Sequence, residues 1–447
     1  MAKRLLKAGF NWRAGLRLAV VATPLCLPAI GYAMGGLISI RHHKAPDQTE
    51  TPNKHTNSSQ PPAFSIPVEP LGYFAPGTFY QGLRHSLVSL DFIDENRLLF
   101  TFRTPGLIRR AAAGEDDERE IRAMVLTLPK GTVEAEALWT LHDHARYLWM
   151  LHDGHFLLRD RDNLQEGDAT LALKPLLHFP GPLLWLEMDP AQQFLVTDSH
   201  EPDASSSHSG EVPSPTTAAA AITSEDEDPS GRPDIVVRIL RRSSGQVLLV
   251  SHVRTTVHLP VNSEGYLEVL RSTGRDWVLN MNYFTGGSRI LGRIESVCTP
   301  AMEFVSPEEV LANTCGTGGG RGLVAMSTDG RRLWAAPSAP TQVWPLLVMA
   351  PNGSRLVRET LTVTRPVDAF SPLNFDDVKS QLVEVYDAAS AKCALKASAS
   401  PVLDGGGNVA ISPSGNRVAV LDAGAIQVYE LAAPPAMQES DIKHSGR

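Results

Sequence analysis

Hydrophobic and polar residues alternate over short stretches along most of the chain, and the pattern is clearest near its end, at residues 408–431. Turn-forming residues divide this stretch twice, at Pro413–Asn416 and at Asp422–Ala425. Between the turns, Val, Ile and Leu recur with the two-residue period of a β-strand. Residues 408–431 are therefore predicted to form three short strands, namely Val409–Ser412, Arg417–Leu421 and Ile426–Leu431.

Six earlier segments repeat this strand-and-turn pattern, and no segment has the 3.6-residue period of a helix of ten or more residues. The earlier units are 87–104 with 121–141, 146–162 with 169–179, 183–199 with 234–253, 256–272 with 275–295, 301–314 with 321–337, and 345–363 with 379–398. Seven units of about four strands predict an all-β fold, a seven-bladed β-propeller. A pair of β-sandwiches is the alternative fold, and the even run of seven units disfavours it.

The last unit ends after three strands, at Leu431, so a closed ring needs a fourth strand from elsewhere in the chain. The segment Tyr73–His85 precedes the first unit, and we expect it to supply that strand. Joining the two ends of the domain in one sheet would leave no open sheet edge between the first and last units.

Four segments outside the repeats organise the rest of the chain. Residues 45–69 are rich in Pro, Thr, Asn and Ser without a hydrophobic period, and are predicted to be a disordered linker before a propeller at 70–433. Residues 201–233 have a similar composition and are predicted to be a disordered surface loop between two neighbouring strands, because strand-like runs flank them. Residues 434–447 are predicted to be a flexible tail, and residues 1–44 a signal peptide or a signal-anchor helix.

Two turns carry a family resemblance. Ser412–Arg417 and Ala350–Arg355, each followed by a hydrophobic strand, resemble the hairpins of bacterial WD40-like propellers. Arg321–Trp334 and Gln381–Leu395 are similar to the repeats of quinoprotein-like propellers. The resemblance covers most of 83–431, although the Gly-His and Trp-Asp dipeptides of eukaryotic WD40 repeats are missing. It implies the propeller fold and no particular function, because propellers serve binding, scaffolding and catalysis.

The N-terminal segment predicts export. Residues 18–40 contain no charged side chain and follow five Lys and Arg residues, which is typical of a helix that spans the membrane with its N-terminus inside. The alternative is a signal peptide cleaved after Ala33, and Pro24 and Pro28 favour this alternative because they would kink a permanent span. We expect an anchored protein that faces the periplasm or another extracytoplasmic side, or a secreted one if residues 1–33 are removed.

The charge of the remaining chain excludes one class of partner. Residues 1–44 hold seven basic residues and no acidic one, so the other 34 Lys and Arg residues face 49 Asp and Glu residues, a formal charge of −15. Phosphate backbones repel a body of this charge, which argues against nucleic-acid binding.

The cysteines allow two interpretations. Cys298 and Cys315 lie 17 residues apart beside a predicted strand pair, and an oxidising compartment would allow a disulfide between them. Free cysteines are commonly buried as small hydrophobic residues, and we favour this second interpretation for both residues and for Cys393. No CxxC motif supports zinc-ribbon or thioredoxin chemistry.

The densest polar cluster lies at residues 141–162. It contains His142 and His144 on one face of an extended segment, then His152, Asp153 and His155. Imidazoles with a carboxylate could bind zinc or another transition metal. The sequence Leu-His-Asp occurs twice here, each time at the end of a predicted strand, and this favours hydrogen-bonded turn residues over a metal site.

The glycine-rich segment Asn313–Gly322 lies between two predicted strands. Its backbone NH groups could form an anion site beside Arg321. The segment lacks the Lys-Ser/Thr end of a P-loop and the spacing of GxGxxG. We therefore favour a wide hairpin loop that glycine permits.

The sequence contains no defensible catalytic, cofactor or metal signature. GxSxG and HExxH are absent, and the acidic pairs Asp91 with Asp94 and Asp376 with Asp377 are predicted to be solvated turn residues. The tryptophans lie mostly within hydrophobic strands and are expected to pack between blades, at positions 12, 139, 149, 185, 277, 334 and 344.

These observations favour an exported binding module for a protein or a cell-envelope component over an enzyme. The alternative is an envelope hydrolase, lyase or oxidoreductase with its site in the central funnel of the propeller. Charged side chains that converge there from several blades would distinguish the two hypotheses.

Overall fold

The computed structural model describes residues 60–75, 87–104, 118–142, 146–201, 235–317, 320–367, 374–388, 390–403 and 406–433. The predicted export segment 18–40, the tail 434–447, His144 and most of the loop 201–233 lie outside these ranges. Within them, no helix is both long and apolar enough to cross a membrane.

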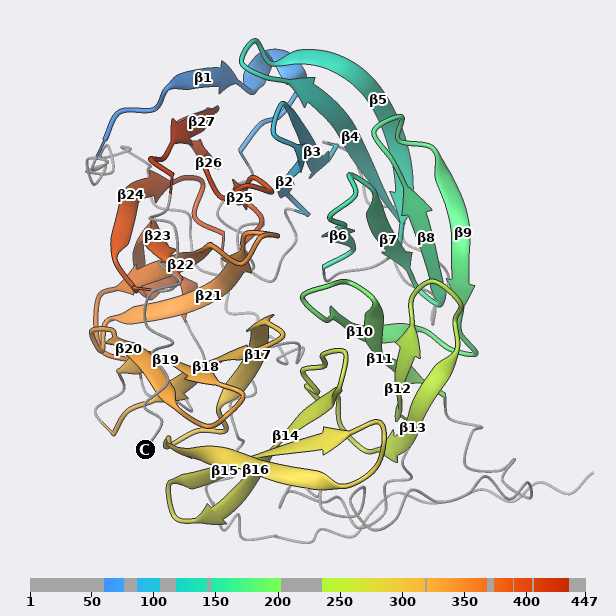
Figure 1. Cartoon of the computed structure of the whole chain (residues 1–447). Helices are drawn as coiled ribbons and strands as arrows, with labels where there is room; N and C mark the ends of the chain where they lie inside the picture. Colours follow the sequence, from blue (N-terminus) through green and yellow to red (C-terminus); the bar gives the residue numbers. More distant parts are fainter. Residues whose placement is uncertain are drawn as a thin grey trace, which may run out of the picture.

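The described strands form seven antiparallel sheets arranged as a closed ring, which confirms the seven-bladed β-propeller (Figure 1). Blade 1 holds β2 (Ser89–Asp94), β3 (Arg97–Arg103), β4 (Arg119–Thr127) and β5 (Thr132–Leu141). Blade 2 holds β6 (Leu148–Met150), β7 (Phe156–Asp160), β8 (Asn163–Gly167) and β9 (Leu173–His178). Blade 3 holds β10 (Leu183–Met188), β11 (Phe194–His200), β12 (Ile235–Arg241) and β13 (Val247–Val253).

Blade 4 holds β14 (Gly265–Thr273), β15 (Asp276–Tyr283) and β16 (Ser288–Glu295). Blade 5 holds β17 (Ala301–Ser306), β18 (Glu309–Cys315), β19 (Arg321–Ser327) and β20 (Arg332–Pro337). Blade 6 holds β21 (Gln342–Met349), β22 (Arg355–Val363), β23 (Val378–Asp387) and β24 (Cys393–Ala399). Blade 7 holds β25 (Val409–Ile411), β26 (Arg417–Asp422), β27 (Ala425–Glu430) and β1 (Phe64–Pro67). Two short 3-10 helices, η1 (Glu69–Leu71) and η4 (Phe375–Asp377), complete the described elements.

The hydrophobic core lies between the blades. Successive side chains of a strand point to opposite faces of its sheet, so one strand contributes to two interfaces. In β3, Leu98 and Phe100 pack against blade 7, whereas Leu99 packs against blade 2. The same division produces seven clusters, one at each interface between neighbouring blades. The continuous hydrophobic runs of the middle strands follow from this burial on both faces.

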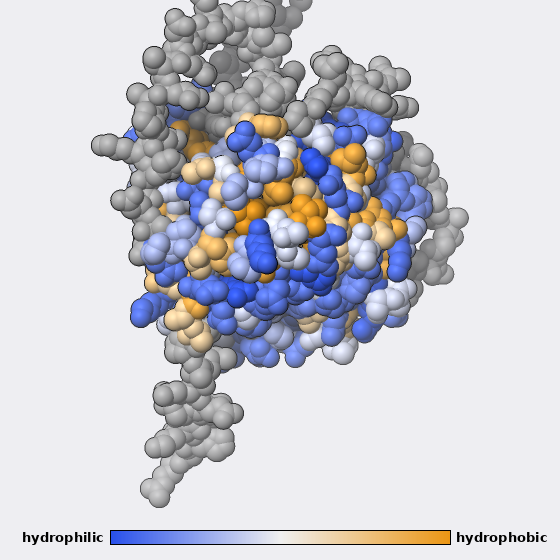
Figure 2. All heavy atoms as spheres, turned by 90° about the horizontal axis from the view of Figure 1, so that it is seen from above, coloured by the Kyte–Doolittle hydropathy of each residue, from blue (hydrophilic) through white to orange (hydrophobic). Residues whose placement is uncertain are grey.

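The outer rim of the ring mixes hydrophobic and polar side chains. Figure 2 shows the rim beside β1 and β5. On β5, Val133 is 39% exposed and Leu138 is 59% exposed. Single exposed hydrophobic residues of this kind are normal on the surface of a folded domain.

Blade 4 departs from the predicted four strands. In the described residues its sheet has three strands, and the segment before β14 meets it through a single bridge between Val261 and Tyr266. The Asn262 Oδ1 atom accepts hydrogen bonds from the amides of Glu264 and Gly265 and so closes a tight turn there. An irregular segment therefore occupies the innermost position of this blade.

Strand β1 closes the ring, and it corrects the predicted closing strand. Phe64–Pro67 pairs with β27 in antiparallel register, with Phe64 opposite Val428 and Pro67 opposite Ala425. Of the predicted strand Tyr73–His85, residues 73–75 are described and lie outside any sheet. The alternation of Phe64, Ile66 and Val68 was obscured by neighbouring prolines, which an edge strand such as β1 tolerates. The folded domain thus begins within the predicted linker.

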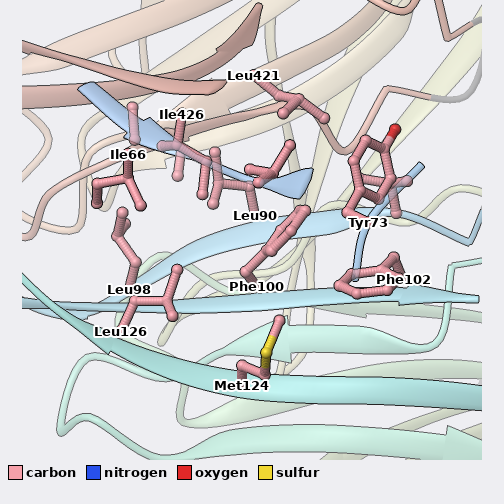
Figure 3. Packing of buried hydrophobic residues seen from close by; sticks show 14 of the residues in the cluster. Ile66, Tyr73, Leu90, Leu98, Phe100, Phe102, Met124, Leu126, Leu421 and Ile426 are labelled. Carbon is pink, nitrogen blue, oxygen red and sulfur yellow. The ribbon is translucent and has the colours of Figure 1, made fainter. Parts of the chain in front are cut away.

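The residues around β1 join the first and last blades. Ile66 is buried among side chains of β27 and β3, and Tyr73 packs edge-on against Phe100 and Phe102 (Figure 3). Gly131, at the β4–β5 turn, approaches Ile66 so closely that a larger residue would collide with it. This interface therefore holds three separate segments of the chain together.

The insertion between β11 and β12 leaves their pairing intact. His200 lies opposite Ile235, so the strands on either side are direct neighbours, as predicted. Glu201 is buried and receives two hydrogen bonds from Arg238, at 2.7 Å and 2.8 Å. Glu201 therefore belongs to the folded blade and not to the predicted disordered loop.

A buried polar network joins blades 6 and 7. Gln381 accepts hydrogen bonds from the Leu403 amide and from Asn408, and it donates one to Glu359. Glu359 is fully buried, and its Oε1 atom has no hydrogen-bond partner among the described residues. Desolvation by burial raises the pKa of Glu359 to about 8.

Replacing Ile66 tests the closure of the ring. We expect Ile66→Ala to lower the free energy of unfolding by about 2–4 kcal/mol, because it leaves a cavity between blades 7 and 1. Ser65 is exposed on the same strand, and Ser65→Ala should change the stability by less than about 0.5 kcal/mol. Chemical denaturation measures both values, and equal effects of the two variants would contradict the closing role of β1.

The Glu359 carboxyl predicts a pH-dependent stability. Its folded pKa lies above the usual 4.5, so stability falls as the pH rises from about 4.5 to about 8 and then levels off. Glu359→Gln should raise the melting temperature by roughly 2–6 °C above pH 8 and by almost nothing below pH 5. The control is Glu295→Gln at an exposed position. A melting-temperature difference that is the same at pH 5 and pH 9 would disprove the assignment.

Candidate functional site

Charged side chains from five consecutive blades face one another around the axis of the ring. We call these five residues the axial cluster: Asp91 of β2, Arg146 before β6, Glu187 of β10, His258 before β14 and Glu303 of β17. Glu303 interacts electrostatically with Glu187, Arg146 and His258, and Asp91 interacts with Arg146. Blades 2 and 5 are not neighbours in the ring, so their side chains can approach only near its axis (Figure 1).

A histidine and a glutamate form the closest pair of the cluster. The Nδ1 atom of His258 lies 3.1 Å from Oε2 of Glu187, and the two side chains are 40% and 14% exposed. The His258 ring also stands edge-on to Trp185, with ring centroids 4.4 Å apart. Because Glu187 engages Nδ1, the other ring nitrogen of His258 is available to a ligand.

Asp198 holds the backbone next to His258 in place. It is completely buried on β11, opposite Trp185 in the strand register. Its Oδ2 atom accepts a 2.7 Å hydrogen bond from the amide of Val257, and its Oδ1 atom has no hydrogen-bond partner among the described residues. Asp198 thereby fixes the segment that carries His258.

The protonation equilibria of the cluster are shifted together. Burial raises the pKa of Asp198 to about 7, and it also raises the pKa of Asp91. Desolvation by the surrounding protein raises the pKa of Glu303, and the negative charge of Glu187 raises it further. Burial alone lowers the pKa of His258, but the hydrogen bond and charge of Glu187 reverse the shift, so that the pKa is raised. Water reaches Glu303 and His258 and screens their charges, which limits the size of these two shifts.

This arrangement can bind a ligand and can exchange protons near neutral pH. Groups whose pKa values lie close to 7 donate and accept protons under ordinary conditions. The cluster combines carboxylates, an imidazole and a guanidinium, and the aromatic ring of Trp185 lies beside it.

The predicted histidine cluster is divided between two places. His142 pairs with Asp160, with 3.1 Å between Nδ1 and Oδ2. His152, Asp153 and His155 line a separate surface pocket of about 460 Å³. Asp153 accepts a hydrogen bond from the His155 amide, which is the turn chemistry that the sequence favoured. Within the described residues, no three His, Cys, Asp or Glu side chains are arranged to hold a metal ion.

The glycine-rich segment lies beside a disulfide. Cys298 and Cys315 are bonded, which overturns the favoured interpretation of separate buried thiols, and Cys393 remains a free thiol. The bond ties the segment before β17 to the end of β18, and Arg321 Nη1 lies 3.7 Å from Cys315 Sγ. Gly318 and Gly319 lie outside the described residues, so the anion site stays a prediction.

The acidic residues that the sequence predicts to be solvated lie in different environments. Asp94 and Asp377 form partly exposed ion pairs with Arg97 and Arg365, as expected for turns. Asp91 belongs to the axial cluster, where it accepts a hydrogen bond from Ser89.

Trp139, Trp149 and Trp277 are buried as predicted. Trp185 and Trp334 are only half-buried, and the Trp185 ring lies against His258. A packing role between blades therefore does not describe all of these rings.

Sequence reasoning missed Arg146, Glu187, His258 and Glu303. Glu187 and Glu303 lie in the first strand of their blades, which forms the inner wall of the ring, and Arg146 lies just before such a strand. His258 lies in the irregular segment that takes the innermost position of blade 4. A charged residue in an otherwise hydrophobic first strand was therefore the available signal. It could be used only after the blade boundaries were known.

Removing the disulfide tests its contribution to the fold. A bridge that closes a loop of this length stabilises by about 3 kcal/mol through the unfolded chain. Cys298→Ser with Cys315→Ser should therefore lower the melting temperature by roughly 3–6 °C. The control Cys393→Ser should change it little. A wild-type protein whose melting temperature is unaffected by reductant would contradict the assignment.

Comparisons with known proteins find only distant structural similarities. No protein-family model matches the chain, and no curated protein matches it either. An oligogalacturonate lyase in complex with manganese is 13% identical with a TM-score of 0.41, over 77% of this chain and 96% of that one. An uncomplexed Pyrococcus horikoshii acylaminoacyl peptidase is 8% identical with a TM-score of 0.44, over 79% of this chain and 52% of that one.

A third structure is Chaetomium thermophilum Sqt1 bound to the N-terminus of a ribosomal protein, 10% identical with a TM-score of 0.39, over 77% of this chain and 95% of that one. No functional argument rests on similarities this low. The chain is a seven-bladed β-propeller by its own strand topology.

Proposed function

We propose that the protein is an exported, membrane-anchored β-propeller that binds a protein or another cell-envelope component at the axial cluster. The observation that carries the proposal is the convergence of Asp91, Arg146, Glu187, His258 and Glu303 from five consecutive blades. Burying and crowding like charges costs free energy, and functional sites are the usual place where proteins accept that cost.

The sequence supports the extracytoplasmic part of the proposal. The uncharged segment 18–40 follows a basic N-terminus, and a polar linker separates it from the first strand. The Cys298–Cys315 disulfide agrees with an oxidising compartment. A propeller held in this way would present its axis to components outside the cytoplasm.

A second candidate function is acid–base catalysis at the same cluster. The observation that favours it is the His258–Glu187 pair beside Glu303, a carboxyl with a raised pKa. A base and an acid placed together in this manner could serve a hydrolase or a lyase. Binding is the leading proposal, since it requires only the convergence of the side chains.

Capture from envelope fractions tests the leading proposal. We expect the immobilised wild-type protein to recover a specific component, and Glu187→Gln and His258→Gln to reduce its recovery by about fivefold or more. Glu136→Gln, which changes an exposed carboxylate of β5 far from the axis, is the matched control and should recover the component like the wild type.

Recovery that is equal for the wild type and both axial variants would refute binding at this site. Chemical conversion of the captured component by the wild type, but not by His258→Gln, would instead favour the catalytic candidate.

A further inference from the structure

The axis of the ring carries more negative than positive groups. Asp91, Glu187 and Glu303 supply three carboxylates, and Asp198 lies just behind them, whereas Arg146 and His258 are the cationic or potentially cationic partners. Arg146 interacts with both Asp91 and Glu303, and His258 is bonded to Glu187. A further cation would therefore reduce the repulsion that these carboxylates exert on one another.

An aromatic surface lies beside the carboxylates. Trp185 is partly exposed and stands edge-on to His258, on the same strand as Glu187. The face of a tryptophan ring attracts an ammonium group, and the attraction adds to that of a neighbouring carboxylate. The combination of Trp185 with Glu187 and Glu303 suits a compact organic cation.

A buried atom behind the pair provides an independent indication. Asp198 is completely buried, and its Oδ1 atom lacks a hydrogen-bond partner among the described residues. Its carboxylate interacts electrostatically with His258 and Glu187, so it lies against the same group. An unsatisfied buried carboxylate oxygen is costly unless a proton or a cation compensates it.

We propose that the axial cluster is a binding site for a primary ammonium group, held between Glu187 and Glu303 and against the face of Trp185. The inference rests on the proposed function and names the chemistry that its partner presents. A lysine side chain of a protein and an amino sugar of an envelope glycan both carry this group. The wider acidic charge of the folded body would attract either one.

Binding of an ammonium group should release protons. A cation next to Glu303 and Asp91 lowers the pKa of each carboxyl from its raised value, so a fraction of their protons leaves when the ligand binds. The affinity should therefore increase as the pH rises toward about 8 and the carboxyls ionise. Arg146, Glu187, Asp198 and His258 face the same space and contribute to the observed titration.

Calorimetry of the full-length protein in detergent tests this proposal. The probes are Nα-acetyl-lysine methylamide and methyl glucosaminide at pH 6.5, in two buffers with different ionisation enthalpies. We expect saturable binding of at least one probe with proton release, and a higher affinity of the lysine probe at pH 8. Stronger binding of the lysine probe would identify a protein partner, and stronger binding of the amino sugar a glycan.

Variants and neutral probes make the test specific. Glu303→Gln and Glu187→Gln should weaken binding by roughly threefold to tenfold, because each removes one attracting charge. Glu136→Gln should bind like the wild type, and the Nε-acetylated lysine probe should not bind.

Two results would overturn the ammonium site: no saturable binding of either amine, or binding that is unchanged in both axial variants. If envelope capture still depends on Glu187 and His258 in that case, the proposed function stands and only the ligand chemistry is wrong. If capture does not depend on them either, both proposals fail.

Discussion

The pairing of β1 with β27 is the interaction on which the rest of the structure depends. A propeller blade buries both faces against its neighbours, so a ring opened at the junction of blades 7 and 1 would expose both hydrophobic faces of that interface. Four residues, Phe64–Pro67, prevent this by joining the start of the domain to its last sheet. Ile66 then packs against both blades at the junction. The ring is closed by strand pairing and by burial of the same residues.

Closure also creates the axial cluster. Asp91 and Glu303 belong to blades 1 and 5, and only the circular arrangement brings such distant strands to a common axis. The cost of removing carboxylates from water appears in the raised pKa values of Asp91, Asp198 and Glu303, which burial causes in the first place and the charge of Glu187 increases for Asp198 and Glu303. The hydrophobic interfaces between blades supply the stability that tolerates this cost. The fold and the proposed site are thus two consequences of one geometry.

The buried polar groups serve different purposes in different places. Gln381, Asn408 and Glu359 join blades 6 and 7 within a buried interface, and this network has a structural role. Glu187 and His258 are similarly paired, but they keep contact with water at the axis. Accessibility to solvent, more than the presence of charge, therefore distinguishes a candidate binding site from a buried polar network that only stabilises the fold.

Local sequence patterns determined the blades, because the alternation of side chains within a strand and the residues of its turns act over a few positions. This is why the seven units, the last three-stranded unit and the adjacency of β11 and β12 were predictable. Closure by Phe64–Pro67 was not predictable, and the choice between a Cys298–Cys315 bond and separate thiols could not be made correctly, since both depend on contacts between segments that local patterns do not compare. The axial cluster was equally hidden: Glu187, His258 and Glu303 look like isolated charges along the chain. Only the closed ring brings them together, because their proximity is a property of the axis and of no single blade.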